Sequence, residues 1–246
     1  MGWFDMDYEF TSQKDFKEAL EEVDILIKLA DEHAEDDIKY SLFLKSGILF
    51  LATKFETFVE DTISEYVHKI CRLKLKVSQL PDDILLSALN YHLTDEFINL
   101  LRQRNNKVYS QINCLTPFFK DNEVIEQINI DHKFSYGRHG AKLIEKLFER
   151  IGHYDIFNQC KICISNESML SDEPLLSYIN LSGQINALTG IRNGIIHENK
   201  SPNLSVQQIT EYRDNITSFV HLLSIMLKSE LNQLSEGGAN TTAVIQ

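Results

Sequence analysis

The chain has 246 residues, of which 43% are hydrophobic and 24% are charged, an ordinary composition for a globular protein. Its 10 glycines and 4 prolines argue for few turns, and so for long helices rather than many short strands. No apolar run approaches the roughly 18 residues of a membrane span, and residues 1–5 lack the basic start of a signal peptide. We therefore expect a cytoplasmic protein that keeps its cysteines reduced and has no contact with a membrane.

The net charge of −12 is unevenly distributed. Residues 1–37 hold 13 acidic and 3 basic residues, so this segment carries −10 and the rest of the chain about −2. Two basic clusters follow, one of Lys69, Arg72, Lys74 and Lys76, the other of Arg102, Arg104 and Lys107. Such clusters attract phosphate, or they are the solvated ends of helices. Affinity for long RNA without a partner should be modest and sensitive to salt.

Two helices are predicted first. Thr11 or Ser12 can cap a helix that runs to about His33, with one apolar and one acidic face. The acidic face is solvated, or it masks a basic site, or it binds a basic partner. A second helix begins at Ile38, reaches about Lys76 and serves as the spine of a bundle or the seam of a dimer. Its apolar stripe consists of Leu44, Ile48, Leu51, Phe55, Phe58, Val59, Ile63, Tyr66 and Ile70.

The middle of the chain is less regular. Pro81 suits the first turn of a third helix. Residues 105–135 have a weak apolar pattern and are interpreted as an insertion of short helices and loops over the bundle. A helix stopped by Gly152 comes next. Cys160 and Cys163 form a single CxxC pair, which is too few ligands for a structural zinc site, so we expect no metal.

The last third is predicted to hold two helices. Residues 165–174 have a loop composition, and a helix should then run from Leu175 to His197. Ser205 and Gln208 make a capping box for a final helix that reaches about residue 234, and residues 235–246 should be a disordered tail. The sequence thus predicts one all-α domain over residues 1–234. We expect an elongated helical bundle with a long antiparallel helix core, an acidic N-terminal helix (1–37) and an irregular helical insertion (105–135).

Arg192, Asn193 and His197 form the most informative motif of the chain. Arginine is always charged and can fork onto a phosphate, and histidine exchanges protons near neutral pH. On a straight helix Arg192 and His197 lie roughly 140° apart, whereas Asn193 and His197 share a face. The three groups therefore converge only if the helix ends or bends near Gly194, or if two chains bring their copies together.

The segment from Ile191 to His197 resembles the hallmark of the HEPN superfamily: arginine, a polar residue, a short spacer, then histidine. Three further stretches are similar to HEPN domains of bacterial defence and toxin–antitoxin loci, of the RiboL-PSP-HEPN kind. They are residues 46–61, Tyr136-Gly137-Arg138-His139-Gly140-Ala141 with the helix after it, and residues 206–227. The resemblance covers roughly residues 38–230.

The resemblance implies a metal-independent endoribonuclease without a cofactor, built as a homodimer with the site where two copies meet. In such an enzyme the 2′-hydroxyl of the RNA attacks the adjacent phosphate, and His197 would move the proton. Arg192 would hold the scissile phosphate, and Asn193 would orient the histidine or contact phosphate. It also implies that Glu56 orients the arginine, and Arg138 and His139 are possible substrate contacts. A toxin or phage-defence role, with a partner from the same operon, belongs to the same family context.

Other interpretations stay open. Arg192 can simply favour the C-terminal end of its helix, where cations are stabilised, with His197 an ordinary helix-end residue. Glu56 can be a surface glutamate, and the segment 137–140 a plain helix start. At the level of function, the alternative is a non-catalytic HEPN module that binds a nucleotide or a partner protein, as an antitoxin, sensor or scaffold.

Overall fold

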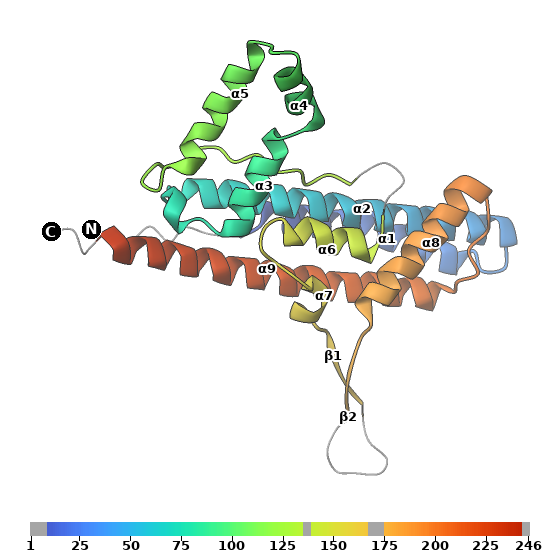
Figure 1. Cartoon of the computed structure of the whole chain (residues 1–246). Coiled ribbons are helices and arrows are strands. Elements are labelled where there is room, and N and C mark those ends of the chain that lie inside the picture. Colours follow the sequence, from blue (N-terminus) through green and yellow to red (C-terminus); the bar gives the residue numbers. More distant parts are fainter. Residues whose placement is uncertain (1–8, 135–138, 167–174, 243–246) are drawn as a thin grey trace.

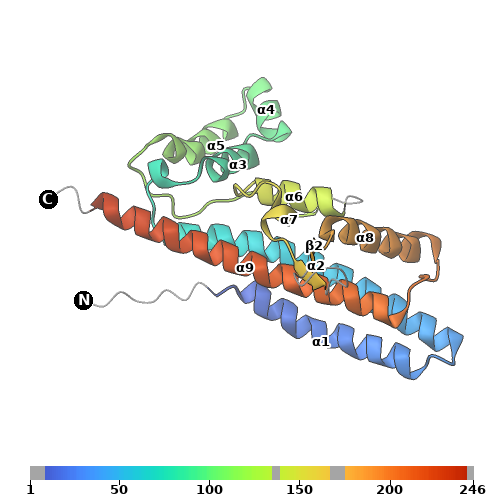
Figure 2. The ribbon, with the colours of Figure 1, turned by 90° about the horizontal axis from the view of Figure 1, so that it is seen from below.

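The computed structural model of the chain describes residues 9–134, 139–166 and 175–242. Three long helices, α1 (Thr11–Glu32), α2 (Asp37–Arg72) and α9 (Val206–Thr242), lie side by side and form the spine of the molecule (Figures 1 and 2). α1 pairs with α2 near the middle of both helices through Glu22 and Lys54, 3.4 Å apart, and at the N-terminal end of α1 through Thr11 and Glu65. α1 is therefore antiparallel to α2, as predicted, and the all-α class is confirmed.

Shorter elements attach to this spine. An arm, which we define as residues 82–120, projects from the C-terminal end of α2 (Figure 1). It holds α3 (Asp82–His92), α4 (Asp95–Arg102), α5 (Lys107–Leu115) and the 3₁₀ helix η2 (Thr116–Phe119), and it follows η1 (Val77–Gln79). α6 (Ala141–Glu149), α7 (Ile156–Gln159) and α8 (Leu181–Glu198) lie against the spine. A hairpin of β1 (Cys163–Asn166) and β2 (Leu175–Tyr178) pairs in antiparallel register.

The core follows the apolar stripe of the second helix. All nine of its predicted positions are buried, from Leu44 to Ile70. Phe55 of α2 packs its ring on Phe16 of α1 and on Phe219 of α9, with centroids 6.4 and 6.1 Å apart. Each such ring contributes roughly 1.5–3 kcal/mol through burial alone, so the three long helices share one apolar interior.

The N-terminus of α1 is capped by another helix, which corrects the prediction that Thr11 or Ser12 is the cap. The backbone N–H groups of Thr11 and Ser12 donate to the two carboxylate oxygens of Glu65 on α2, at 2.9 and 3.0 Å. Ser12 is buried, and its hydroxyl accepts from that of Thr62 at 2.9 Å. Burial acts to raise the pKa of Glu65, but these two amides and Lys69 outweigh it and hold that pKa below its usual value.

Several boundaries differ from the predicted ones. α2 stops at Arg72 rather than Lys76, and Lys74 adopts a left-handed φ of 51°. Residues 175–178 form strand β2 instead of helix, so α8 starts at Leu181. α9 continues to Thr242, about two turns past residue 234, where the sequence predicted a disordered tail.

The irregular region also differs from the prediction. It begins earlier than residue 105, because α3 and α4 belong to the same projection, and the arm points away from the bundle instead of lying over it (Figure 1). The capping box of the last helix is confirmed: Ser205 N donates to Gln208 Oε1 at 2.9 Å, and Gln208 N donates back to Ser205 Oγ at 3.2 Å.

The cysteines and the apolar segments form neither a metal site nor a membrane span in the part of the chain that is described. Cys160 is buried and Cys163 exposed, both as free thiols. Within residues 9–134, 139–166 and 175–242, no three histidine, cysteine or acidic side chains gather as metal ligands. Across the same ranges, no helix combines the length and apolar character that crossing a bilayer requires.

Because Glu65 of α2 caps the N-terminus of α1, we expect Glu65→Gln to destabilise the fold. The amide of glutamine has one accepting oxygen where the carboxylate has two, so one of the two N–H groups loses its acceptor, and we expect a loss of about 1–2 kcal/mol in urea unfolding at pH 7. Because the pKa of Glu65 is lowered in the folded state, its contribution is present at neutral pH and lost as pH falls through that lowered pKa. The difference between original and variant should therefore shrink in acid. Glu18→Gln, at an exposed position of α1, is the control and should change little.

Candidate functional site

The signature residues lie on α8, a helix that continues through Gly194 to Glu198. Its N-terminus is capped by Asn180, whose Oδ1 accepts from Gly183 N at 2.9 Å. Asn199 ends it in the left-handed conformation, with φ at 49°. Ile185 and Leu188 are buried, and Ile195 is half-buried against the core. The helix therefore does not end near Gly194, which removes the first of the two ways in which Arg192 and His197 could meet.

Arg192 points toward the spine, where it meets Glu56 of α2. Its Nη2 lies 4.0 Å from Glu56 Oε2, and its Nη1 donates to Asn193 Oδ1 at 3.1 Å. The side chain is 17% exposed. Its buried Nε has no hydrogen-bond partner among the described residues. The guanidinium is thus anchored on one side and keeps donors available.

Glu56 also holds His139, so one carboxylate contacts two cationic or titratable groups. Nδ1 of His139 lies 2.9 Å from Glu56 Oε1, and the imidazole stacks on Phe134 with centroids 5.9 Å apart. Burial raises the pKa of Glu56 above its ordinary value, although His139 and Arg192 both act to lower it. The structure thus brings together three of the predicted residues, Glu56, His139 and Arg192, from α2, the start of α6 and α8.

Gly140 and Asn186 fix the approach of α6 to α8. Asn186 Oδ1 accepts from Ala141 N at 3.0 Å and so satisfies one free amide at the start of α6. Gly140 has φ at 102°, and a Cβ there would lie 2.8 Å from the same Asn186 oxygen. Only glycine fits both the backbone conformation and the space. This glycine makes the helix start that the sequence allowed, and it sets the position of His139 beside it.

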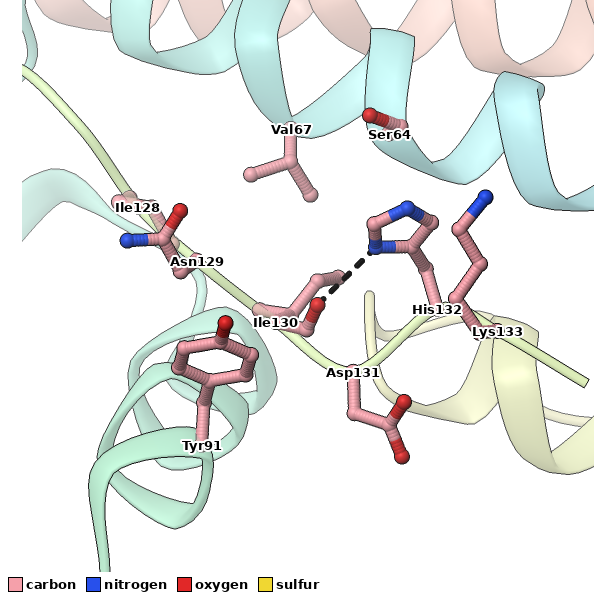
Figure 3. A pocket seen from close by; sticks show the side chains of 9 residues that line it. All are labelled: Ser64, Val67, Tyr91, Ile128, Asn129, Ile130, Asp131, His132 and Lys133. Carbon is pink, nitrogen blue, oxygen red and sulfur yellow. Dashed lines mark hydrogen bonds between the residues drawn. The ribbon is translucent and has the colours of Figure 1, made fainter. Parts of the chain in front are cut away.

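Glu60, one turn after Glu56 on α2, anchors the segment that leads into His139. It accepts from Phe134 N at 2.7 Å and from Lys133 Nζ at 2.8 Å. The same segment borders a cavity of about 210 Å³ beside α2, with Tyr91 opposite (Figure 3). In it, Nδ1 of His132 lies 3.0 Å from the carbonyl of Ile130. Arg138, predicted as a possible substrate contact, lies outside the described residues.

His197 lies on the other side of α8. Its side chain is exposed, near Asn193 one turn before and Gly190 two turns before. Five residues of helix rotate its side chain roughly 140° away from that of Arg192. Within one chain, then, the arginine faces the spine and the histidine faces solvent. The roles predicted for Arg192, Asn193 and His197 remain predictions.

A hollow of about 340 Å³ lies between α8 and residues 200–203, and Gly190, Gly194 and Ile195 are among the α8 residues that border it. A Cβ added at Gly190 would meet no atom within 4 Å, so this part of the helix is uncovered. Backbone without side chains allows another helix or a nucleic-acid backbone to approach closely. The open face carries Asn193 and His197 at its edge.

Comparison with known families gives one finding for this chain. The family model described as RiboL-PSP-HEPN matches residues 14–229. The chain belongs to the RiboL-PSP-HEPN family. The searches of curated proteins and of solved structures found no match. Family membership supports a HEPN-type domain, of a kind that commonly dimerises and binds RNA. It does not by itself assign an activity to this protein.

Three contributors to the site were not singled out from the sequence: Glu60, Asn186 and Phe134. Glu60 lies four residues after Glu56, so both were recognisable as a pair on one helix face. Asn186 lies six residues before Arg192 without a motif of its own, and Phe134 falls in the region interpreted as an irregular insertion. Glu60 contacts Phe134, and Asn186 contacts Ala141, across more than 40 residues of sequence, so no local pattern could have identified these contacts.

Gly140→Ala should loosen the site and the fold together. The added methyl group would meet Asn186 Oδ1 at 2.8 Å on a backbone that L-residues avoid, so we expect a loss of at least about 1–2 kcal/mol in urea unfolding. Gly190→Ala is the matched control, because its methyl group meets open space inside a helix and should stabilise by roughly 0.5–1 kcal/mol. Equal unfolding midpoints for the two variants would contradict the packing described for Gly140.

Proposed function

We propose that this protein is a metal-independent endoribonuclease whose active site is completed by two copies of the chain. One observation carries the proposal: α8 presents an exposed His197 while Arg192 of the same motif is held half-buried by Glu56, in a chain of the RiboL-PSP-HEPN family. These are the two groups that cleavage of an RNA phosphodiester needs, a proton carrier and a fixed positive charge.

In the proposed reaction, a 2′-hydroxyl attacks the adjacent phosphorus and the bond to the 5′-oxygen breaks. The proton of the 2′-hydroxyl leaves, and the 5′-oxygen gains one, so the products end in a 2′,3′-cyclic phosphate and a 5′-hydroxyl. His197 moves the proton as acid or base, and Arg192 stabilises the charge on the phosphate oxygens. Asn193, which already accepts from Arg192, positions the guanidinium or contacts phosphate.

Glu56 is proposed as a positioning residue for Arg192. The carboxylate holds the guanidinium in place through the contact at 4.0 Å and holds His139 at 2.9 Å. A preorganised cation loses little conformational freedom when it meets the transition state, and it is then worth more than a mobile one. His139 and Arg138 are proposed only as substrate contacts.

The two-copy site follows from the geometry of one helix. Because Arg192 and His197 are rotated roughly 140° apart, a phosphate that touches both is best served by the arginine of one copy and the histidine of the other. The uncovered Gly190 of α8 gives a surface at which a second copy can come close. A toxin or phage-defence role is part of this proposal and rests on the family alone.

A non-catalytic module is the second candidate, and one observation favours it. The charge of Arg192 is already opposed by Glu56, so its first role can be to hold α8 on α2. In that case the domain binds a nucleotide or a partner protein through the exposed face of α8 or the acidic face of α1. The two candidates differ in whether RNA is cut.

Cleavage should depend on His197 and Arg192. In EDTA, the purified protein is expected to cut total RNA and leave cyclic phosphate ends, detected by end mapping. His197→Ala and Arg192→Ala should each reduce the rate at least about 100-fold, the usual loss of a proton carrier or a charge-stabilising group. Growth arrest on expression should be relieved by the same variants.

His68→Ala is the matched control for this experiment, because His68 is exposed on α2 and away from the signature. It should leave the rate unchanged. Cleavage that requires a divalent metal ion would contradict the mechanism. Absence of any cleavage, with original and variants equally harmless to cells, would favour the non-catalytic module.

The two-copy site also predicts the effect of blocking α8. Gly190→Arg adds a long side chain to the uncovered face, and the open space around Gly190 allows the single chain to keep its fold. We expect the variant to have the mass of a monomer by light scattering, unchanged helicity by circular dichroism and little cleavage. A fully active monomer would rule out a site shared between copies.

A further inference from the structure

The arm carries an unusual share of the exposed apolar surface. Eight of the 17 exposed large hydrophobic side chains of the described part of the chain lie within residues 82–120. The two most exposed aromatic rings among them are Phe119 and Tyr109, at 70% and 69%. They lie at the end of η2 and near the start of α5. Rings left this open have no packing role within the single chain, which points to a ligand.

The arm is also the basic part of an acidic protein. Residues 97–120 contain four basic residues and no acidic one, so they carry +4 while the rest of the chain carries −16. Arg102, Arg104 and Lys107 are exposed and make no ion pair with any described residue. Lys120 has only a distant pair with Glu123, at 3.9 Å. These cations are therefore available to a negatively charged partner.

Arg104 occupies a position that usually belongs to glycine. Its φ is 53°, and its N–H donates to Leu101 O while Asn105 N donates to Leu100 O, both at 3.0 Å. This is the closing motif of a helix whose left-handed residue is most often glycine. An L-residue there costs about 1 kcal/mol or more. The backbone is thus strained at the residue that places a guanidinium at the tip between α4 and α5.

We propose that the arm is a second nucleic-acid contact, a platform on which single-stranded RNA lies outside the cleavage site. We define its basic–aromatic surface as Arg102, Arg104, Lys107, Tyr109, Phe119 and Lys120. The cations contact phosphates, and the two open rings stack on bases, which is how proteins hold single strands without reading their sequence. The inference rests on the proposed function for the identity of the polymer as RNA.

The charges favour RNA over a protein partner. A second copy that docked arm to arm would bring +4 against +4, and like charges brought together across a protein interface are costly. A polymer of phosphates instead gains from every unpaired cation of the arm, and each phosphate contact releases counterions. The arm supplies the positive charge that the acidic spine lacks.

The position of the arm sets the length of RNA that uses it. It leaves the spine after Arg72, and Glu56 lies 16 residues earlier on α2, so the base of the arm is roughly 24 Å from Glu56 along the helix. At about 3.4 Å per stacked nucleotide, this distance corresponds to roughly seven nucleotides. Strands shorter than that should not reach both the arm and Glu56 on the same chain.

The test is binding of a fluorescent 20-nucleotide single-stranded RNA with 2′-O-methyl groups throughout, measured by anisotropy with the full-length protein. Without a free 2′-hydroxyl the probe cannot be cut by the proposed chemistry, so binding is measured separately from cleavage. The combined variant Arg102→Gln, Arg104→Gly, Lys107→Gln should bind at least 10-fold more weakly. The slope of log affinity against log salt should fall by about 2, at roughly 0.7 per lost phosphate contact. Tyr109→Ala and Phe119→Ala should each weaken binding by about 5-fold or more.

Two controls match these changes. Lys14→Gln, Lys17→Gln, Lys28→Gln removes the same charge from α1 and should leave affinity nearly unchanged. Tyr178→Ala removes a ring that is 60% exposed outside the arm and should do the same. Arg104→Gly alone should raise the unfolding midpoint, because glycine relieves the left-handed strain, and this separates lost binding from lost folding.

Each outcome decides the inference. Arm variants that bind the probe like the original protein overturn it, even if the protein cuts RNA. Arm variants that change the oligomeric mass while probe binding stays intact also overturn it, since the surface is then a protein interface. If the arm variants lose probe binding while the original protein cuts no RNA, the arm inference stands and the proposed ribonuclease fails.

Discussion

The carboxylate of Glu56 is the contact on which the arrangement of this molecule depends. It sits on the spine helix between Phe55 and Phe58, two buried rings, and it faces away from them toward His139 and Arg192. One side chain therefore joins α2, the start of α6 and α8. A charge this poorly hydrated is stable only where opposite charges surround it, so it selects one docking position for the elements that bring them. The raised pKa of Glu56 reflects that burial.

The same helix repeats this arrangement one turn later. Glu60 holds residues 133 and 134 as Glu56 holds residue 139, and Glu65, five residues further along α2, caps the N-terminus of α1. Isolated ion pairs on a protein surface contribute little to stability. These three glutamates contribute more than such pairs, because they accept from backbone amides or from cations that are held in place. α2 is thus both the apolar centre of the bundle and the element that orders its polar contacts.

Acidic and basic residues are concentrated on different elements of the structure. The acidic helix α1 covers one side of the spine, the signature helix α8 lies near the start of α2, and the basic arm projects from its far end (Figures 1 and 2). If the arm holds RNA, the negative body would keep the rest of the strand from adhering elsewhere, because like charges repel. Attraction and repulsion would then both direct the strand.

How much the sequence could reveal depended on the range of the interactions. Periodic apolar residues identified the spine and its buried positions, since Leu44 to Ile70 repeat at helical spacing that local geometry alone explains. The capping box at Ser205 and Gln208 is local in the same sense. The strand at residues 175–178 was missed because its partner, residues 163–166, is needed to make it a strand. The direction in which the arm projects was not predicted, because the apolar pattern of a sequence identifies helices but not how they are oriented in space.

For the site, the sequence by itself predicted which residues would carry chemistry, Arg192, Asn193 and His197 at fixed spacing on one helix, and it determined the family to which the chain belongs. It also determined that Arg192 and His197 face apart, because the rotation of a helix is a local property. Only the tertiary structure decided which of the two turns inward, and that Glu56 meets both Arg192 and His139 there. These contacts join residues far apart in the chain, and their energy exists only once the helices have packed.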